Sequence, residues 1–478
     1  MRSNPLRLTL PPLAGVLVVL SLLGLAADRT GAGNRAPDNP AFSALAETLV
    51  RQPSQVLPAS GILQVADEVA GEVAALRGWA FKAPVSKEIT SPKALGPYLQ
   101  REIDTNLPPG RRQRVQAFLR TIGLLPPDCD LKATLLRLLE NQVGGFYDSE
   151  TKILHLVERP GMSLPIERVV LAHELTHALD DQQVGLDRFV KANAHQSEDM
   201  DLVTMSIGEG SATSLMIQYI AALQAADRLS FEDLQQYGRA ELERSKPFLD
   251  APRYFSMMLG SYVCGTEFLG RSNLLTQALA SDNRAVGDNL QAAVKDPPRS
   301  TEQILHPAKY WDRAARDEPV VVDDTSATAW LRQPGRWVVH RDTIGEMLVA
   351  LLTTPARQLP DLLDMQTAAD WTNTAATGWG GDRFFLLASG ASAEQAGRAL
   401  TRLEGVWVTA WDTPRDRDEF LAALAKGPDA GRYATALVGS KATVVFLGVS
   451  DEERGRLGDR LRTTPLRFTR DGKPWEPQ

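Results

Sequence analysis

Apolar and polar residues follow two different patterns along the chain. From about residue 41 onward, apolar residues recur every three or four positions, and this spacing predicts amphipathic helices. Examples are the segments 62–76, 112–122 and 131–139. Residues 144–158 interrupt the helical pattern with short strand-like runs, including one at 153–157 that follows a turn. We therefore expect a mainly helical unit that contains one small sheet.

Beyond about residue 319, strand-like runs alternate with helices. The runs lie at 383–387, 406–411 and 443–449. Two of the helices have starts that match capping boxes, Ser392 with Gln395 and Ser450 with Glu453. The sequence thus predicts an α+β protein in which a domain at 41–320 precedes a smaller α+β domain at 321–478. The second domain has no nucleophile elbow, phosphate-binding loop or metal-ligand cluster in its sequence.

The amino terminus has the pattern of an export signal. Arg2 and Arg7 precede an apolar run at 13–27 that ends in small residues, which predicts a signal peptide at 1–27 and a Gly/Pro/Asn-rich linker at 28–40. The protein is then exported to the periplasm, the cell surface or the medium. If the segment stays uncleaved, residues 8–27 would anchor the protein in a membrane.

Charge and cysteine content limit the partners and the covalent structure. The formal net charge is −7 with both signs spread along the chain, so no electrostatic case exists for nucleic-acid binding. The two cysteines, Cys129 and Cys264, could form one disulfide after export. Two buried thiols are the preferred interpretation, because nothing in the sequence brings the two residues together.

The segment His-Glu-Leu-Thr-His at 173–177 is the part of the sequence that most clearly indicates a chemical function. On a helix, His173 and His177 project about 40° apart and about 6 Å along the axis, so both imidazoles can reach one metal ion. Glu174 then lies beside the metal's open position, where it can take a proton from bound water. The alternative is an amphipathic helix whose histidines have no ligand role. Pro165 and Gly185 suit the start and the end of this helix.

A catalytic zinc needs a third protein ligand, and the expected ligand is Glu209. The metzincin pattern is excluded, because Asp180 and Gln183 occupy the positions of its Gly and His. Glu209 lies on the apolar side of a second helix, whose small residues near 208–212 would let it approach the first closely. Glu198 is the competing acid. Asp181, one turn beyond His177, is expected to accept the second ring N–H of that histidine, and the alternative is a solvated acid at the helix end beside Asp180.

These residues resemble the gluzincins, metallopeptidases with two His and one Glu on zinc. Glu209-Gly-Ser-Ala resembles the segment that carries the third ligand in aminopeptidase N-like enzymes, although the spacing from the second His is longer here. Tyr262-Val-Cys-Gly is similar to a motif whose tyrosine hydrogen-bonds the oxyanion, and the resemblance implies that role for Tyr262. From about residue 80 onward the chain is also similar to uncharacterised secreted bacterial and archaeal gluzincin-like proteins. The blocks concerned begin at Gly145, His173, Pro298 and Gly378.

The resemblance implies a zincin-like catalytic domain and an exported Zn²⁺-dependent peptidase that acts on peptides or proteins. Glu174 would be the general base on zinc-bound water, and Tyr262 would donate to the oxyanion unless it is a core tyrosine. His306 is a second oxyanion candidate, against a structural role in a turn. Strand 153–157, with His155 as a strand side chain, would align an extended substrate as an edge strand. The alternative function is a non-catalytic exported binding module with a structural or vestigial zinc site.

Overall fold

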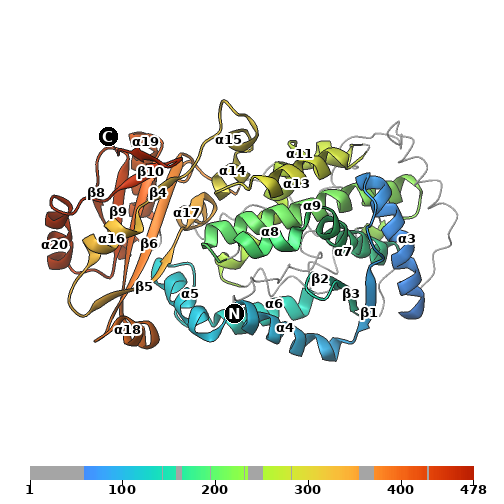
Figure 1. The fold of residues 1–478 in the computed structure, drawn as a ribbon, viewed down its shortest axis with the longest axis horizontal. Coiled ribbons are helices and arrows are strands. Elements are labelled where there is room, and N and C mark those ends of the chain that lie inside the picture. The colour runs from blue at the N-terminus through green and yellow to red at the C-terminus, as the bar shows by residue number, and fades with distance from the viewer. Residues whose placement is uncertain are drawn as a thin grey trace.

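The computed structural model describes residues 59–142, 144–157, 164–193, 195–230, 232–234, 251–280, 282–354, 371–427 and 430–477. The predicted signal peptide at 1–27, the linker at 28–40 and the possible anchor at 8–27 lie outside these ranges. No helix in the described ranges is both long and apolar enough to cross a membrane. Helices dominate and the strands form small sheets, which confirms the α+β class (Figure 1).

The first part of the chain is mainly helical, as its spacing predicts. Its longest helices, α7 (Leu164–Val184) and α9 (Glu198–Ala225), are buried on nearly all sides, so they form the centre of this part rather than its surface. The other helices here are α3 (Ala59–Arg77), α4 (Pro92–Asn106), α5 (Pro109–Ile122), α6 (Leu131–Gln142), α8 (Leu186–Asn193), α11 (Ser256–Gly270), α12 (Leu274–Ala278), α13 (Arg284–Lys295), α14 (Thr301–Leu305) and α15 (Ala308–Trp311). Arg253–Phe255 forms the short 3-10 helix η1.

Helix α7 ends where the sequence predicts. Gly185 adopts a φ of +70°, and its amide donates to the carbonyl of Asp181. A left-handed glycine directly after the last helical turn is the common helix stop, because glycine alone has no Cβ to clash in that conformation.

The small sheet consists of β1 (Ser86–Thr90), β2 (Gly145–Asp148) and β3 (Ile153–Val157), in the order β1-β3-β2. Strand β3 is confirmed at 153–157, but its expected position at the sheet edge is wrong. It pairs in parallel with β1 on one side and antiparallel with β2 on the other. Its backbone groups are therefore used within the sheet, and β3 has no edge to which a substrate strand could add.

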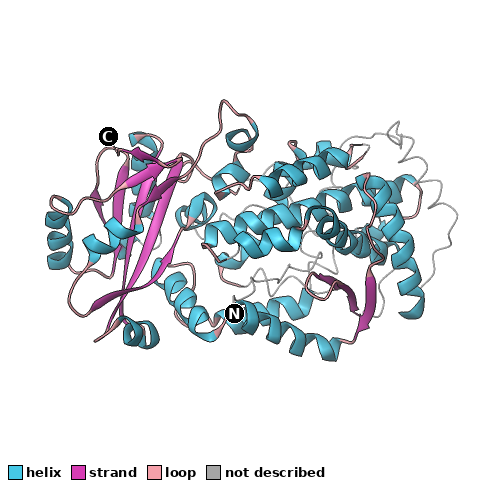
Figure 2. Cartoon of the chain, in the orientation of Figure 1, coloured by secondary structure: helices cyan, strands magenta, loops and turns pink. Residues whose placement is uncertain are grey.

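The second part is built on a five-stranded antiparallel sheet in the order β5-β6-β7-β9-β8. Its strands are β5 (Arg336–Asp342), β6 (Trp379–Ser389), β7 (Thr401–Trp411), β8 (Tyr433–Leu437) and β9 (Ala442–Leu447). A second sheet joins β4 (Val320–Val322), β10 (Phe468–Arg470) and β11 (Lys473–Trp475). The helices are α16 (Asp324–Leu331), α17 (Gly345–Thr353), α18 (Ala393–Ala399), α19 (Pro414–Lys426) and α20 (Asp451–Leu461), with a 3-10 turn, η2, at Ala430–Arg432. Figure 2 shows helices between this strand-rich end and the small sheet.

Side-chain caps begin four of these helices, α16, α18, α19 and α20. Ser392 and Ser450 each accept a hydrogen bond from the amide three residues later, as their sequence positions suggest. The reciprocal capping box, with both bonds present, occurs instead at Thr413 and Asp416. Each of these side chains satisfies a helix-end amide that has no partner within its own helix.

The two parts share a hydrophobic core. Helix α17 lies between the five-stranded sheet and the helical part (Figure 1), and one cluster of buried side chains continues from α5 and α9 into β6 and β7. Phe118 of α5 packs edge-on against Phe384 of β6, with ring centroids 4.9 Å apart. Cys129 and Cys264 are free thiols, as preferred from the sequence.

Candidate metal centre

Helices α7 and α9 bring three potential metal ligands together. The Nε2 atoms of His173 and His177 are 3.1 Å apart, and they lie 3.2 and 3.5 Å from Oε2 of Glu209. Tetrahedral zinc with bonds of about 2.0–2.1 Å needs ligand atoms separated by about 3.3 Å. The three observed separations scatter around that value. The spacing of these three atoms is thus compatible with one face of a zinc tetrahedron, and the described residues group no fourth potential ligand with them.

Burial of these three side chains is energetically unfavourable without a bound cation. His173, His177 and Glu209 are all buried, and Nδ1 of His173 has no hydrogen-bond partner. Charged and polar groups in such a position are stable only when they pair with one another or with a metal. The chemistry of the donors, two imidazoles and one carboxylate, is the usual set for a catalytic zinc.

The protonation of the three ligands follows from their burial and mutual contacts. Burial lowers the pKa of His173 to about 4, so this imidazole is neutral. Burial also acts against the charges of the other two residues, but their attraction and hydrogen bond outweigh it. As a result the pKa of His177 is raised to about 9 and that of Glu209 is lowered to about 2. In the absence of a metal, a proton on His177 balances the Glu209 carboxylate.

Glu174 is oriented by the small sheet. Its Oε2 accepts a hydrogen bond of 2.8 Å from the backbone amide of Tyr147 on β2. Burial raises the pKa of Glu174 to about 8, and the Glu209 carboxylate contributes to that rise. A nearby cation would favour the ionised form and return Glu174 to the state that a general base requires. This contact joins residues far apart in the chain, and it was not predicted from the sequence.

A buried polar network joins α3, α7 and α9. Arg77 on α3 lies 3.4 Å from the carboxylate of Asp180 and donates to Oγ of Ser211 at 2.9 Å, and Ser211 donates to Asp180 at 2.6 Å. All three side chains are fully buried. Because Asp180 follows His177 and Ser211 follows Glu209, this network sets the distance between the two ligand-bearing helices.

The small residues of α9 serve contacts with two helices. Ser211 bonds to Asp180 on α7, as the expected close approach requires, whereas Gly210 faces α11. A Cβ placed on Gly210 would lie 2.2 Å from the backbone of Gly265 on α11, and one on Gly265 would lie 1.9 Å from the carbonyl oxygen of Ser206. These glycines therefore allow the close approach of α9 and α11 rather than of α9 and α7. This approach places Tyr262 of α11 next to the candidate ligands His173 and Glu209.

Tyr262 lies against the metal ligands and is fully buried. Its ring stacks on that of His173 with centroids 6.2 Å apart. Its pKa is raised well above the usual value, first by burial and then by the nearby Glu209 carboxylate. The structure therefore brings Tyr262 to the site from the side of Glu209, where it can orient that ligand. Donation to an oxyanion remains a prediction.

The expected contact between Asp181 and His177 is wrong. The Asp181 carboxylate accepts from the phenol of Tyr147 at 3.0 Å, from Nζ of Lys152 at 2.5 Å and from the amide of Asp187 at 3.1 Å. It therefore ties α7 to the small sheet and to the start of α8. A one-turn spacing places Asp181 and His177 on the same side of the helix. The Asp181 carboxylate nevertheless accepts its hydrogen bonds from groups outside the helix.

Glu198 is not the third ligand. It lies at the start of α9, eleven residues before Glu209, a separation of about 16 Å along the helix axis. Its carboxylate accepts from the phenol of Tyr254 at 2.5 Å. His155 lies on β3, where it stacks on Phe146 with centroids 4.5 Å apart, in agreement with a role as a strand side chain.

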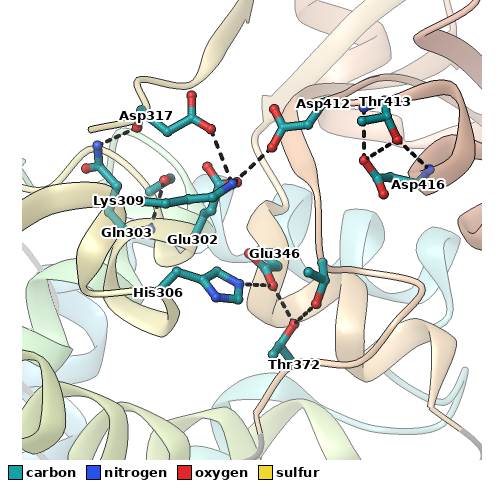
Figure 3. Close-up of polar contacts among 12 residues, drawn as sticks. Glu302, Gln303, His306, Lys309, Asp317, Glu346, Thr372, Asp412, Thr413 and Asp416 are labelled. Carbon is teal, nitrogen blue, oxygen red and sulfur yellow. Dashed lines mark hydrogen bonds and ion pairs between the residues drawn. The ribbon is translucent and has the colours of Figure 1, made fainter. Parts of the chain in front are cut away.

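His306 belongs to a different polar cluster (Figure 3). Its Nε2 lies 2.8 Å from the buried carboxylate of Glu346 on α17, and Thr372 bonds to the same carboxylate oxygen. The structure does not group His306 with His173, His177 and Glu209, because its side chain is directed toward α17. A role for His306 in the oxyanion site therefore has no geometric support.

The same region holds three further carboxylates, on Glu302, Asp317 and Asp412, with ligand atoms close enough for a cation. Nζ of Lys309 lies between them, at 2.5 Å from Glu302, 3.2 Å from Asp317 and 3.0 Å from Asp412 (Figure 3). An ammonium group thus already supplies the positive charge there. This cluster joins the helical part to the end of β7.

Comparisons with known proteins bear on the second part of the chain. A family model described as a domain of unknown function (DUF8575) matches residues 328–456, a span from α16 to α20 that does not include the metal centre. No curated protein and no solved structure gives a match. The resemblance to gluzincins therefore rests on the motifs and on the site geometry.

Proposed function

We propose that the protein is an exported zinc-dependent peptidase whose catalytic centre is formed by His173, Glu174, His177 and Glu209. The observation that carries this proposal is the convergence of three ligand atoms at separations of 3.1, 3.2 and 3.5 Å beside a buried carboxylic acid. Export is inferred from the sequence pattern at 1–27. The substrate is a peptide or protein, because the donor set and the adjacent Glu174 are those of amide-hydrolysing zinc sites.

His173 and His177, together with Glu209, would hold the ion. A bound zinc would lower the pKa of a coordinated water towards 7 and polarise the scissile carbonyl. Glu174, held by the Tyr147 amide, would accept the proton of the attacking water and pass it to the leaving amine. A second candidate function, a binding module with a structural zinc, has less support, because structural sites are usually closed by four protein ligands. Among the described residues, three potential ligands lie together at this site.

The test combines metal analysis with a peptide assay on the wild type, Glu174→Gln and Glu167→Gln. Glu167 lies on the same helix two turns earlier and serves as the matched control. All three proteins should bind one zinc per chain, and a broad peptide library should be cleaved by the wild type and the control. Glu174→Gln should lose at least about a hundredfold in kcat. Stoichiometric zinc without any hydrolysis in the wild type would support the binding-module function instead.

A further inference from the structure

A mostly apolar cavity opens beside the metal ligands. It has a volume of about 180 Å³, and His177 and Glu209 form part of its wall. Apolar side chains from α5, α6, α8, α9 and α11, and from Leu107 just after α4, make most of the remaining wall. They include Leu107, Val115, Leu131, Leu135, Met205 and Met257. The cavity therefore borders two of the three candidate metal ligands.

The polar groups of this cavity already have partners within the protein. Asp181 is bound by Tyr147 and Lys152, Arg111 faces Asp201 at 3.9 Å, and Glu198 accepts from Tyr254. A charged substrate side chain entering the cavity would lose its hydration and find a mainly aliphatic wall. An apolar side chain would instead gain from leaving water. The cavity therefore selects for an apolar occupant.

The size of the cavity limits the occupant to one side chain. An engineered protein cavity of about 150 Å³ accommodates benzene. A space of 180 Å³ therefore suits the side chain of leucine, methionine or phenylalanine, whereas a long acyl chain would exceed it. The unbranched methionines in its wall, Met205, Met257 and Met258, can adjust to occupants of different shape.

We propose that this cavity is the specificity pocket of the enzyme and that it binds a large apolar side chain of the residue flanking the scissile peptide bond. The inference rests on the proposed peptidase function for its choice of substrate. It does not require that hydrolysis occur, because binding of a side chain next to the metal can be measured separately.

The direct test uses two metal-chelating probes, N-acetyl-glycine hydroxamate and N-acetyl-leucine hydroxamate, on the zinc-loaded full chain. Both probes offer the same chelating group, and they differ in the side chain alone. Burial of the leucine side chain should make the second probe bind about ten to a hundred times more tightly. Equal affinities, or no binding of either probe, would overturn the pocket assignment.

Two variants locate the effect in this cavity. Val115→Phe adds volume to the wall on α5 and should remove most of the difference between the two probes. Leu138→Ala is the control, because Leu138 is buried on α6 but does not line the cavity, and the difference should persist. Zinc content and the circular dichroism of each variant show that it has folded. A preference that survives Val115→Phe would contradict the assignment.

Peptide libraries with varied residues on both sides of the scissile bond separate the two proposals. Cleavage concentrated at leucine, methionine and phenylalanine supports both. Cleavage without any side-chain preference refutes the pocket and leaves the peptidase in place. A strong hydroxamate preference without cleavage of any peptide keeps the pocket and refutes the hydrolytic function.

Discussion

Metal affinity is expected to depend on pH, and His177 is the one ligand of the three that must lose a proton. Of the three ligands, His173 is neutral and Glu209 is ionised at neutral pH, since burial and mutual contacts set their pKa values at about 4 and about 2. His177 still carries a proton, because its pKa is raised to about 9. A protonated imidazole nitrogen cannot bind a metal, so zinc must displace that proton. Affinity should therefore rise with pH and level off above about pH 9.

The size of the change in zinc affinity follows from the difference between the working pH and the pKa of His177. Between pH 9 and pH 7, displacement of one proton weakens the apparent affinity by about a hundredfold, or about 2.7 kcal/mol at 1.36 kcal/mol per pH unit. Glu174, whose pKa burial raises to about 8, should also ionise when a cation binds. Its proton would weaken the affinity by up to about another tenfold at pH 7. The dependence should thus steepen below pH 8.

Calorimetric titration with zinc in two buffers of different ionisation enthalpy counts the protons released. At pH 7 the wild type should release between one and two protons, and Glu174→Gln should release one. Competition with a chelator of known affinity at each pH gives the slope independently. A zinc affinity that is constant between pH 6 and pH 9, or binding without proton release, would refute the proposed charge states of the centre.

Three further outcomes are expected. In urea titrations, the unfolding free energy of the metal-free protein should fall between pH 6.5 and about 9. The raised pKa of His177 stabilises the fold fully below pH 6.5, and this stabilisation is lost as the proton leaves. The zinc-loaded protein should show no such loss. Arg77→Met should lower the unfolding free energy by about 3–5 kcal/mol, since it leaves Asp180 buried without its cation, whereas the exposed Arg398→Met should change it little. Asp181→Asn should change the zinc affinity by no more than about threefold. A loss of about 10–100-fold would instead indicate that Asp181 contacts His177 directly.

The ligand-bearing helix could be predicted because its geometry is local. The spacing of His173 and His177 fixes their common face through the 3.6-residue period, and Gly185 marks the helix end through its tolerance of positive φ. The grouping of Glu209 with the two histidines was also expected from the sequence, because a carboxylate on the apolar side of a helix needs a partner. Its role as a metal ligand stays a prediction.

The partners of neighbouring acids could not be predicted in the same way. Asp181 shares a helix face with His177, yet it binds Tyr147 and Lys152, which come from the small sheet. Strand β3 has the expected bounds, but β1, which lies more than sixty residues earlier, covers one of its edges. Such pairings depend on which distant segments pack together, and the local pattern of polar and apolar residues contains no information about that.

The sequence by itself determined which potential metal ligands share one face of α7, the α+β class and several helix boundaries, since each depends on backbone geometry and neighbouring residues. Tertiary structure decided how Glu174 is held by the Tyr147 amide, how Arg77 fixes the distance between α7 and α9, and which side chains enclose the cavity. These contacts join residues far apart in the chain. Their formation depends on the burial of whole helices, because only the packed interior removes competing water from the buried charges.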